Sequence, residues 1–337
     1  MEVAMRPRLL PDTHLLPSDR GVVISGPRHT AAFALPGMYP WLERLRPFLD
    51  GRSSLDQLTA GLAPQAARHV RTLVDLLVRE GFARDAARDL PHGLSPEVRA
   101  RHASLIDFVA ARADSPEHRF ERYRDCAPVV VGAGRLAGAL VLALIASGVA
   151  HIRLHIDEAA DDGTARLRDC VAQLREEDHS FRYEELDGPL DRLPPDTGVL
   201  LLGSDVFTPD SMARAHTLAE RAGVRYGQAV GRGDHIVISA VSEPRGASES
   251  PPPGDSSDSG GTARETTASA GGNARTRKPS SYLGGPVAAL AADQLCLHLL
   301  YRTAGLDGPD VDGRPSPVAE PVALDLRTGR LVGADAA

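Results

Sequence analysis

Lysine is nearly absent from this chain of 337 residues, in which Lys278 is the only one and every other permanently basic side chain is an arginine. A mechanism that needs a lysine in a folded site is therefore disfavoured. Cysteine is also scarce, because three residues far apart in the sequence supply neither a disulfide framework nor a CxxC zinc site. A basic surplus is missing as well: the formal net charge is -7, which gives no general affinity for nucleic acid.

Targeting and membrane segments are not evident either. The N-terminal run MEVAMRPRLLPDTH lacks the apolar core of a signal peptide. The long apolar run 129–150 contains Arg135 and several glycines and is followed at once by a strand pattern, so we interpret it as the core of a soluble domain and not as a membrane span. We expect a cytoplasmic protein of about two domains.

The chain is organised around the stretch Pro128–Asp157, PVVVGAGRLAGALVLALIASGVAHIRLHID. An apolar strand leads into a glycine-rich turn, a long apolar helix and a second strand, which is the order of a nucleotide-binding βαβ unit. In such a turn, glycines permit the bend and the approach of a pyrophosphate, and a third small residue lets the helix pack on the strand. The matching residues are Gly132, Gly134, Ala137 and Gly138, with Asp157 at the end of the second strand.

Helix and strand patterns alternate around this unit. Expected helices cover 95–112, 163–176, 208–221 and 284–302, and expected strands cover 181–185, 198–202, 224–230, 235–240 and 322–326. This alternation predicts an α/β fold with a doubly wound, mainly parallel, Rossmann-like sheet. Asp205 follows the strand 198–202, where open α/β sheets place their ligand crevice.

A separate N-terminal domain is expected over residues 1–89. Three strand patterns (13–16, 21–25 and 29–35) precede three helical patterns (38–49, 54–62 and 64–79), an α+β order that predicts a winged helix-turn-helix. A transcriptional regulator would place residues 66–79 in the major groove of DNA. Residues 1–90 hold twelve arginines against ten acids, too balanced a charge for that role, and we expect no nucleic-acid partner.

A peptide can use the same shape by adding a strand to the exposed edge of the small sheet. The runs PRLLP (7–11), LDGRSSLD (49–56) and LVREGF (77–82) resemble the peptide-recognition element of ribosomal natural-product pathways, typified by the pyrroloquinoline-quinone peptide chaperone. The resemblance implies that the leader of a precursor peptide pairs with the third strand and packs against the last helix. The implied peptide-binding residues are Arg28, His29, Thr30, Ala31, Ala32, Phe33, Ala34, Leu35, Arg71, Val74, Asp75 and Val78.

From about Leu94 onward the chain resembles a second family. The runs GAGRLAG, LLLGSDVFTPD and SYLGGPVAALAADQL are similar, in the same order, to the adenylating domain of the ThiF and ubiquitin-activating-enzyme superfamily. A peptide-recognition element followed by a ThiF-like domain resembles the leader-binding partner protein of YcaO cyclodehydratases, which form azoles in precursor (TOMM) peptides. This resemblance implies a precursor leader peptide and a YcaO-type enzyme as partners, and a homodimer.

The expected nucleotide site departs from that family. Where relatives have a ribose-binding acid this chain has Ile156, and Asp157 comes one residue late. Relatives hold the triphosphate with a lysine and arginines, whereas the acidic run 158–162 stands here and opposes adenylyl transfer. Asp205 matches the metal-binding aspartate. We therefore expect no catalytic residue, no metal site and no cofactor, with ATP or Mg²⁺ only if the site is active, and vestigial nucleotide-binding residues at Gly132, Gly134, Gly138, Asp157 and Asp205.

Residues 242–281 are rich in Ser, Gly and Pro and lack large apolar residues, so we expect a disordered insertion that divides the ThiF-like domain into 94–241 and 282–337. The expected function is a non-catalytic adaptor that presents a precursor peptide to a YcaO-type cyclodehydratase. Two alternatives would use the glycine turn. One is an ATP-dependent adenylyltransferase acting on a peptide carboxylate, and the other is a nicotinamide-dependent oxidoreductase with Asp157 on the ribose.

Overall fold

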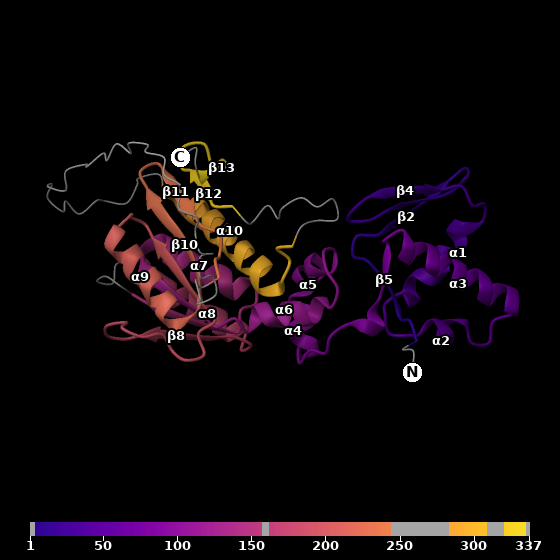
Figure 1. Ribbon diagram of the computed structural model, residues 1–337, viewed down its shortest axis with the longest axis horizontal. Helices are drawn as coiled ribbons and strands as arrows, with labels where there is room; N and C mark the ends of the chain where they lie inside the picture. Colours follow the sequence, from indigo (N-terminus) through magenta and orange to yellow (C-terminus); the bar gives the residue numbers. More distant parts are fainter. Residues whose placement is uncertain (1–3, 157–161, 244–282, 309–319, 335–337) are drawn as a thin grey trace, which may run out of the picture. The chain divides into compact units, whose positions relative to one another are not determined.

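A computed structural model of the chain describes residues 4–156, 162–243, 283–308 and 320–334 (Figure 1). The chain forms two compact units, Met1–Asp125 with Leu300–Ser316 and Cys126–Leu299 with Pro317–Ala337. Residues 94–125, which we expected to open the second domain, therefore group with the first unit. Asp157 and residues 244–281 of the expected insertion lie outside the described residues.

The first unit contains the three strands and three helices predicted over residues 13–79. Strands β2, β3 and β4 form an antiparallel sheet in that order, and β1 pairs with β5. The strands are β1 (Pro7–Leu9), β2 (His14–Ser18), β3 (Gly21–Ser25), β4 (Thr30–Phe33) and β5 (Ala83–Asp85). The helices are α1 (Met38–Leu45), η1 (Arg46–Phe48), α2 (Leu55–Thr59), α3 (Pro64–Arg79), η2 (Ala86–Arg88), α4 (Pro96–Arg101), α5 (Ala103–Ala110) and α6 (Pro116–Arg124).

Local sequence signals set several of these boundaries. Helix α2 begins with a capping box, in which the Ser54 side chain accepts from the Gln57 N–H and the Gln57 side chain accepts from the Ser54 N–H. Helix α3 starts at a proline, whose missing N–H is not needed there. The single helix expected over 95–112 was wrong, because the helix is interrupted at His102 and continues as α5.

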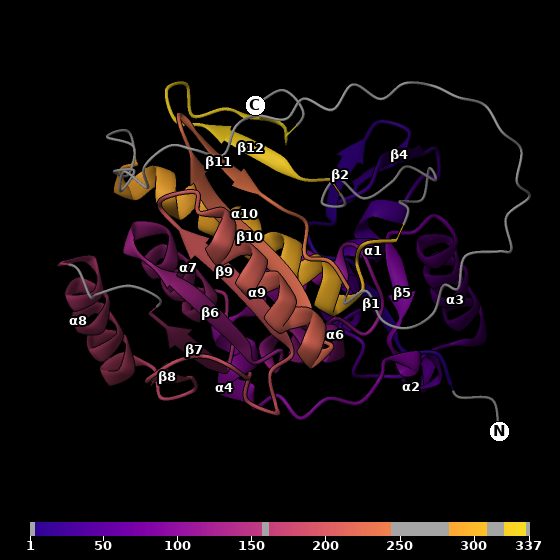
Figure 2. The same ribbon diagram turned by 60° about the vertical axis from the view of Figure 1, so that its left-hand side comes forward.

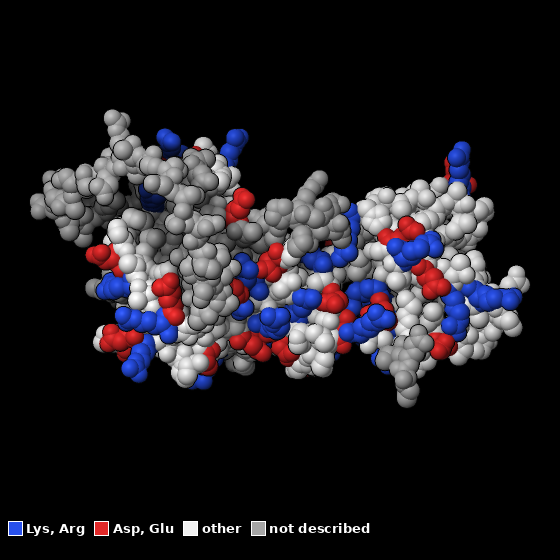
Figure 3. All heavy atoms as spheres, viewed as in Figure 1, with Lys and Arg blue, Asp and Glu red and all other residues white. Residues whose placement is uncertain are grey.

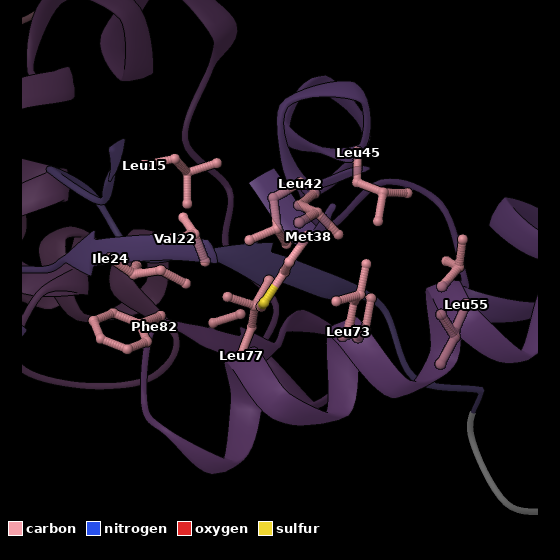
Figure 4. Close-up of a cluster of buried hydrophobic side chains, with 14 residues drawn as sticks. Leu15, Val22, Ile24, Met38, Leu42, Leu45, Leu55, Leu73, Leu77 and Phe82 are labelled. Atoms are coloured by element: carbon pink, nitrogen blue, oxygen red, sulfur yellow. The ribbon is translucent and has the colours of Figure 1, made fainter. Parts of the chain in front are cut away.

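A buried apolar cluster joins this sheet to its helices (Figure 4). Val22 and Ile24 project from β3, Met38 and Leu42 from α1, and Leu73, Leu77 and Val74 from α3, and all are at most 3% exposed. Phe82, which follows α3, closes the cluster and is fully buried. Burial of these side chains, each contributing about 1.5–3 kcal/mol, holds α1 and α3 against the sheet.

The second unit is built on an eight-stranded sheet in the order β13-β12-β11-β10-β9-β6-β7-β8. Strands β8, β7, β6, β9 and β10 are parallel, and β11, β12 and β13 extend the sheet in antiparallel fashion. The strands are β6 (Pro128–Ala133), β7 (His151–His155), β8 (Arg182–Leu186), β9 (Val199–Ser204), β10 (Arg225–Arg232), β11 (His235–Ile238), β12 (Val322–Asp325) and β13 (Leu331–Gly333). The helices are α7 (Gly134–Ala146), α8 (Asp162–Glu177), α9 (Pro209–Ala222) and α10 (Gly285–Ala304), whose residues from Leu300 onward are assigned to the first unit.

Helices cover both faces of this sheet (Figure 2). On one face, Ala215 and Ala219 of α9 pack with Leu200 and Leu202 of β9. On the other, Leu295 of α10 reaches the β10 backbone at Gly227. The expected mainly parallel α/β sheet is thus confirmed. Its strand order reverses between β6 and β9, which is the switch point where open α/β sheets bind ligands.

Candidate functional site

The glycine turn, residues Gly132–Gly138, lies at this switch point, where β6 ends and α7 begins. The residue before α7, Ala133, caps no helical N–H group, and the first turn of α7 contains no acid. The carboxylate of Asp205, which follows β9, caps the start of α7 instead. Its Oδ2 accepts from the Arg135 N–H at 2.9 Å and its Oδ1 from the Leu136 N–H at 2.8 Å. A carboxylate is favoured here because the first N–H groups of a helix are unsatisfied and the helix dipole is positive at this end.

Glycines make the room that Asp205 occupies. A Cβ atom at Gly134, where φ is 83°, would lie 2.5 Å from Asp205 Oδ2. A Cβ at Gly231 in β10 would lie 2.3 Å from the Asp205 carbonyl oxygen. Gly132 has φ 135°, and a Cβ there would lie 1.9 Å from the Gly203 carbonyl oxygen. Side chains at these positions would therefore collide with the backbone or the carboxylate that form the turn.

Gly138 has a different environment from the other two expected glycines. A Cβ atom at this position would meet nothing within 4 Å. The close approach of helix and strand depends instead on Gly203, where a Cβ would lie 2.9 Å from the Cα of Ala137. Ala137 therefore supplies the third small position of the motif.

Two arginines to which the sequence analysis gave no role belong to this region: Arg135 lies within the turn, and Arg232 follows Gly231, which lies against Asp205. Arg135 is exposed and donates from Nη1 to the Leu283 carbonyl at 3.1 Å. The Arg232 guanidinium, at the end of β10, lies 5.6 Å from the centroid of the Phe207 ring. Ile156, at the expected ribose-binding position, is described, whereas Asp157 and the single lysine lie outside the described residues.

A bound ATP–Mg²⁺ complex would have to displace contacts that the chain makes with itself. The two N–H groups that would receive a phosphate already bond to Asp205, which is also the residue expected to bind the metal. Within the described ranges, no group of three or more His, Cys, Asp or Glu side chains is placed to hold a metal ion. We therefore derive no reaction step through a nucleotide.

The second candidate site is the edge of the small sheet at β4, which pairs only with β3 among the described residues. The Gly26 N–H donates to the His29 carbonyl at 3.0 Å, so these two residues form a hydrogen-bonded pair. Such pairs alternate along antiparallel strands, and Ala31 is the next residue of β4 that bonds to β3. The N–H and C=O groups of Thr30 and Ala32 consequently point away from β3, toward the open edge.

The opposite edge, at β2, is less able to accept another strand. Ser18 and Gly21 flank a two-residue turn and form a bonded pair, so the next residue, Pro17, faces outward. Proline has no N–H to donate, and proline on an edge strand is a common means of blocking further pairing. The first strand expected from the sequence ended at residue 16, so the sequence analysis did not place Pro17 on this edge.

The expected peptide contacts fall into four groups. Ala31, Phe33 and Val78 are partly buried and pack against the core cluster. Arg28, His29 and Arg71 have partners within the chain: the Ala111 carbonyl at 3.1 Å, the Phe82 ring at 4.5 Å between centroids, and Asp56 at 2.8 Å. Val74 is fully buried in the cluster, so it is a core residue and is not retained as a peptide contact. The remaining expected residues, Thr30, Ala32, Ala34, Leu35 and Asp75, are exposed.

Neither candidate site has a surplus of one charge that would favour a strongly basic or strongly acidic partner. On the face shown in Figure 3, arginine side chains alternate with Asp and Glu. Helix α3 carries Arg68, Arg71 and Arg79 together with Asp75, and Arg71 is paired with Asp56. Taken one by one, the described helices are too short or too polar to reach across a lipid bilayer.

No family model matches the chain, and no curated protein matches it. Solved structures share its fold over nearly its whole length. Crystal structures of E. coli MccB with MccA-N7isoASN and with ATP align with TM-scores of 0.61 and 0.60, both at 12% identity, covering 97% and 98% of this chain and 96% of MccB. The crystal structure of SeMet PaaA aligns with a TM-score of 0.61 at 15% identity, covering 95% of this chain and 97% of PaaA. At these identities the likeness establishes the fold.

Proposed function

We propose that this protein is a leader-peptide-binding adaptor, which captures a ribosomally made precursor peptide on β4 and presents it to a YcaO-type cyclodehydratase for azoline or azole formation. The N-terminal elements β2–α3 would act as a winged helix-turn-helix recognition element. The ThiF-like second part would dock on the enzyme, and a homodimer is the proposed assembly. Tethering of this kind can strengthen engagement by about 10²–10⁴ without new chemistry in the adaptor.

The observation that carries this proposal is the open edge of β4. Thr30 and Ala32 direct backbone donors and acceptors outward, as strand addition requires. Beside them, Ala31, Phe33 and Val78 offer partly buried apolar surface to alternate side chains of an added strand. The fold similarity to MccB, crystallised with MccA, is consistent with a ligand of this class.

The test is binding of a fluorescent leader peptide, encoded by a small reading frame beside the gene, to the full-length protein. Ala32→Pro removes the outward N–H without removing a bond to β3, and it should weaken binding at least about tenfold, the effect of one or two lost hydrogen bonds. Ala32→Ser keeps the N–H and is the matched control. Equal binding by both variants, or no binding by the wild type, would contradict strand addition at β4.

Hydrogen exchange gives an independent readout of the same edge. In the free protein the amides of Thr30 and Ala32 should exchange faster than the amide of Ala31, which bonds to β3. Added leader peptide should slow exchange at Thr30 and Ala32. Protection that appears elsewhere in the chain, with β4 unchanged, would place the peptide at another site.

A second candidate function is ATP-dependent adenylation of a peptide carboxylate. The observation in its favour is the fold shared with MccB, for which a structure with ATP exists, over 98% of this chain. ATP–pyrophosphate exchange stimulated by the precursor peptide would support this candidate. Its absence, in a preparation that binds the leader, would favour the adaptor.

A further inference from the structure

We propose that Asp205 is a built-in substitute for a nucleotide phosphate. Its carboxylate occupies the anion position at the start of α7 and keeps the glycine turn folded without a nucleotide. Nucleotide would then have to displace this side chain before it could bind.

The hydrogen bonds carry the first step of this inference. Both carboxylate oxygens accept from consecutive backbone N–H groups, those of Arg135 and Leu136, at 2.9 and 2.8 Å. These are the groups with which a helix N-terminus after a glycine-rich turn would hold a phosphate. A phosphate and a carboxylate cannot share two donors, and their like charges repel at such short range. Asp205 and a nucleotide phosphate are therefore competitors for one position.

The surrounding backbone carries the second step. Gly231 lies against the backbone of Asp205, and Gly134 lies against its side chain, each within a distance that no Cβ could tolerate. Glycine at position 134 is thus required by the carboxylate that is present, independently of any pyrophosphate. Because α7 has no cap of its own, Asp205 supplies a cap from 70 residues away in the sequence.

The third step rests on the contacts of two arginine side chains, Arg135 and Arg232. The exposed Arg135 side chain donates to the Leu283 carbonyl, and Arg232 stacks over Phe207. Both contacts direct the guanidinium groups to partners within the chain. Groups of the chain itself therefore make the contacts that a nucleotide would otherwise make at the turn. An adaptor could in this way keep the fold of an adenylating domain without ATP.

The experiment compares the thermal unfolding midpoints of the full-length wild type and Asp205→Ala, with and without inorganic phosphate or Mg·ATP. The variant should lose about 5 °C, and phosphate should restore part of that loss while shifting the wild type little. Asp210→Ala is the matched control, because it removes an acid from the first turn of α9. Identical midpoints for Asp205→Ala and wild type, or stabilisation of the wild type by Mg·ATP as large as that of the variant, would overturn the inference.

A second measurement decides the matter if Asp205→Ala does not fold. In the nucleotide-free wild type, the amides of Arg135 and Leu136 should exchange with solvent at least about tenfold more slowly than unbonded amides, because each donates to a carboxylate. Rapid exchange at both would overturn the inference. Leader binding by β4 is measured separately and should be the same in Asp205→Ala and wild type, so this proposal and the proposed function can fail independently.

Discussion

Arg8 and Glu117, 109 residues apart in the chain, form an ion pair in which Arg8 Nη1 lies 2.8 Å from Glu117 Oε1. The pair links β1 to the first turn of α6, and the Glu117 side chain is 15% exposed. Together with the hydrogen bond from the Ser115 N–H to Asp89, it explains why α6 groups with the N-terminal unit. An interaction this distant in sequence leaves no periodic signal from which to predict it.

The first prediction concerns the pH dependence of this ion pair. Burial alone would raise the pKa of the Glu117 carboxyl, but the hydrogen bond and charge of Arg8 outweigh it, and the pKa lies below its usual value. The pair therefore stabilises the fold fully above the unfolded-state pKa of about 4.3, and this stability is lost as the pH falls through the lower folded-state pKa. Glu117→Gln should lower the free energy of unfolding by about 1.5–3 kcal/mol at pH 7, and by less at pH 4, measured by urea denaturation.

The control for this prediction is Glu43→Gln. Glu43 lies 3.9 Å from Arg46 in an exposed pair on α1, and such pairs contribute about 0–1 kcal/mol. Its removal should change the unfolding free energy little at either pH. A cost for Glu117→Gln that is the same at pH 7 and pH 4 would show that the ion pair is not its source.

The second prediction separates two glycines of the glycine turn. Gly132→Ala should destabilise the second unit strongly, by about 3 kcal/mol or more, because the added Cβ meets the Gly203 carbonyl and the φ of 135° is unfavourable for alanine. Gly138→Ala adds a methyl group in open space within α7 and should stabilise it by about 0.5–1 kcal/mol. Denaturant titration of both variants tests this pair. Similar effects of the two substitutions would contradict the described packing of the turn.

Sequence patterns were sufficient for most of the elements but not for their contacts. The 3.6-residue period located α3 and α9, because burial on one face of a helix imposes it. Continuous apolar runs located β6 and β9, because these strands are buried on both faces. The 3.6-residue spacing placed Val74 and Val78, four residues apart, on one side of α3 and could not say which of the two side chains the core buries fully. The helix break at His102 was also missed, as was the pairing of β1 with β5, which joins segments more than 70 residues apart.

At the candidate site, too, the sequence identified residues but not the contacts between them. Gly132 and Gly134 were found from the motif, and Asp205 from its place after a strand. That the Asp205 carboxylate caps α7 follows from the adjacency of β6 and β9 in the sheet, which residues 70 positions apart do not reveal. The role of Gly231 was hidden for the same reason, since β10 reaches Asp205 only once the sheet is assembled.

The third prediction distinguishes the core of the N-terminal unit from its proposed peptide-binding surface. Val74 is fully buried, so Val74→Ala should lower the unfolding free energy by about 2 kcal/mol and leave leader affinity nearly unchanged. Val78 is only partly buried, so Val78→Ala should cost less stability but weaken leader binding by about fivefold or more, as for a contact residue. Chemical denaturation and fluorescence anisotropy with the leader peptide measure the two quantities. The contrary outcome is that Val74→Ala lowers the affinity for the leader peptide more than Val78→Ala does, at a temperature where both variants are folded. The peptide would then not lie along this side of α3, and the proposed site at β4 would have to be abandoned.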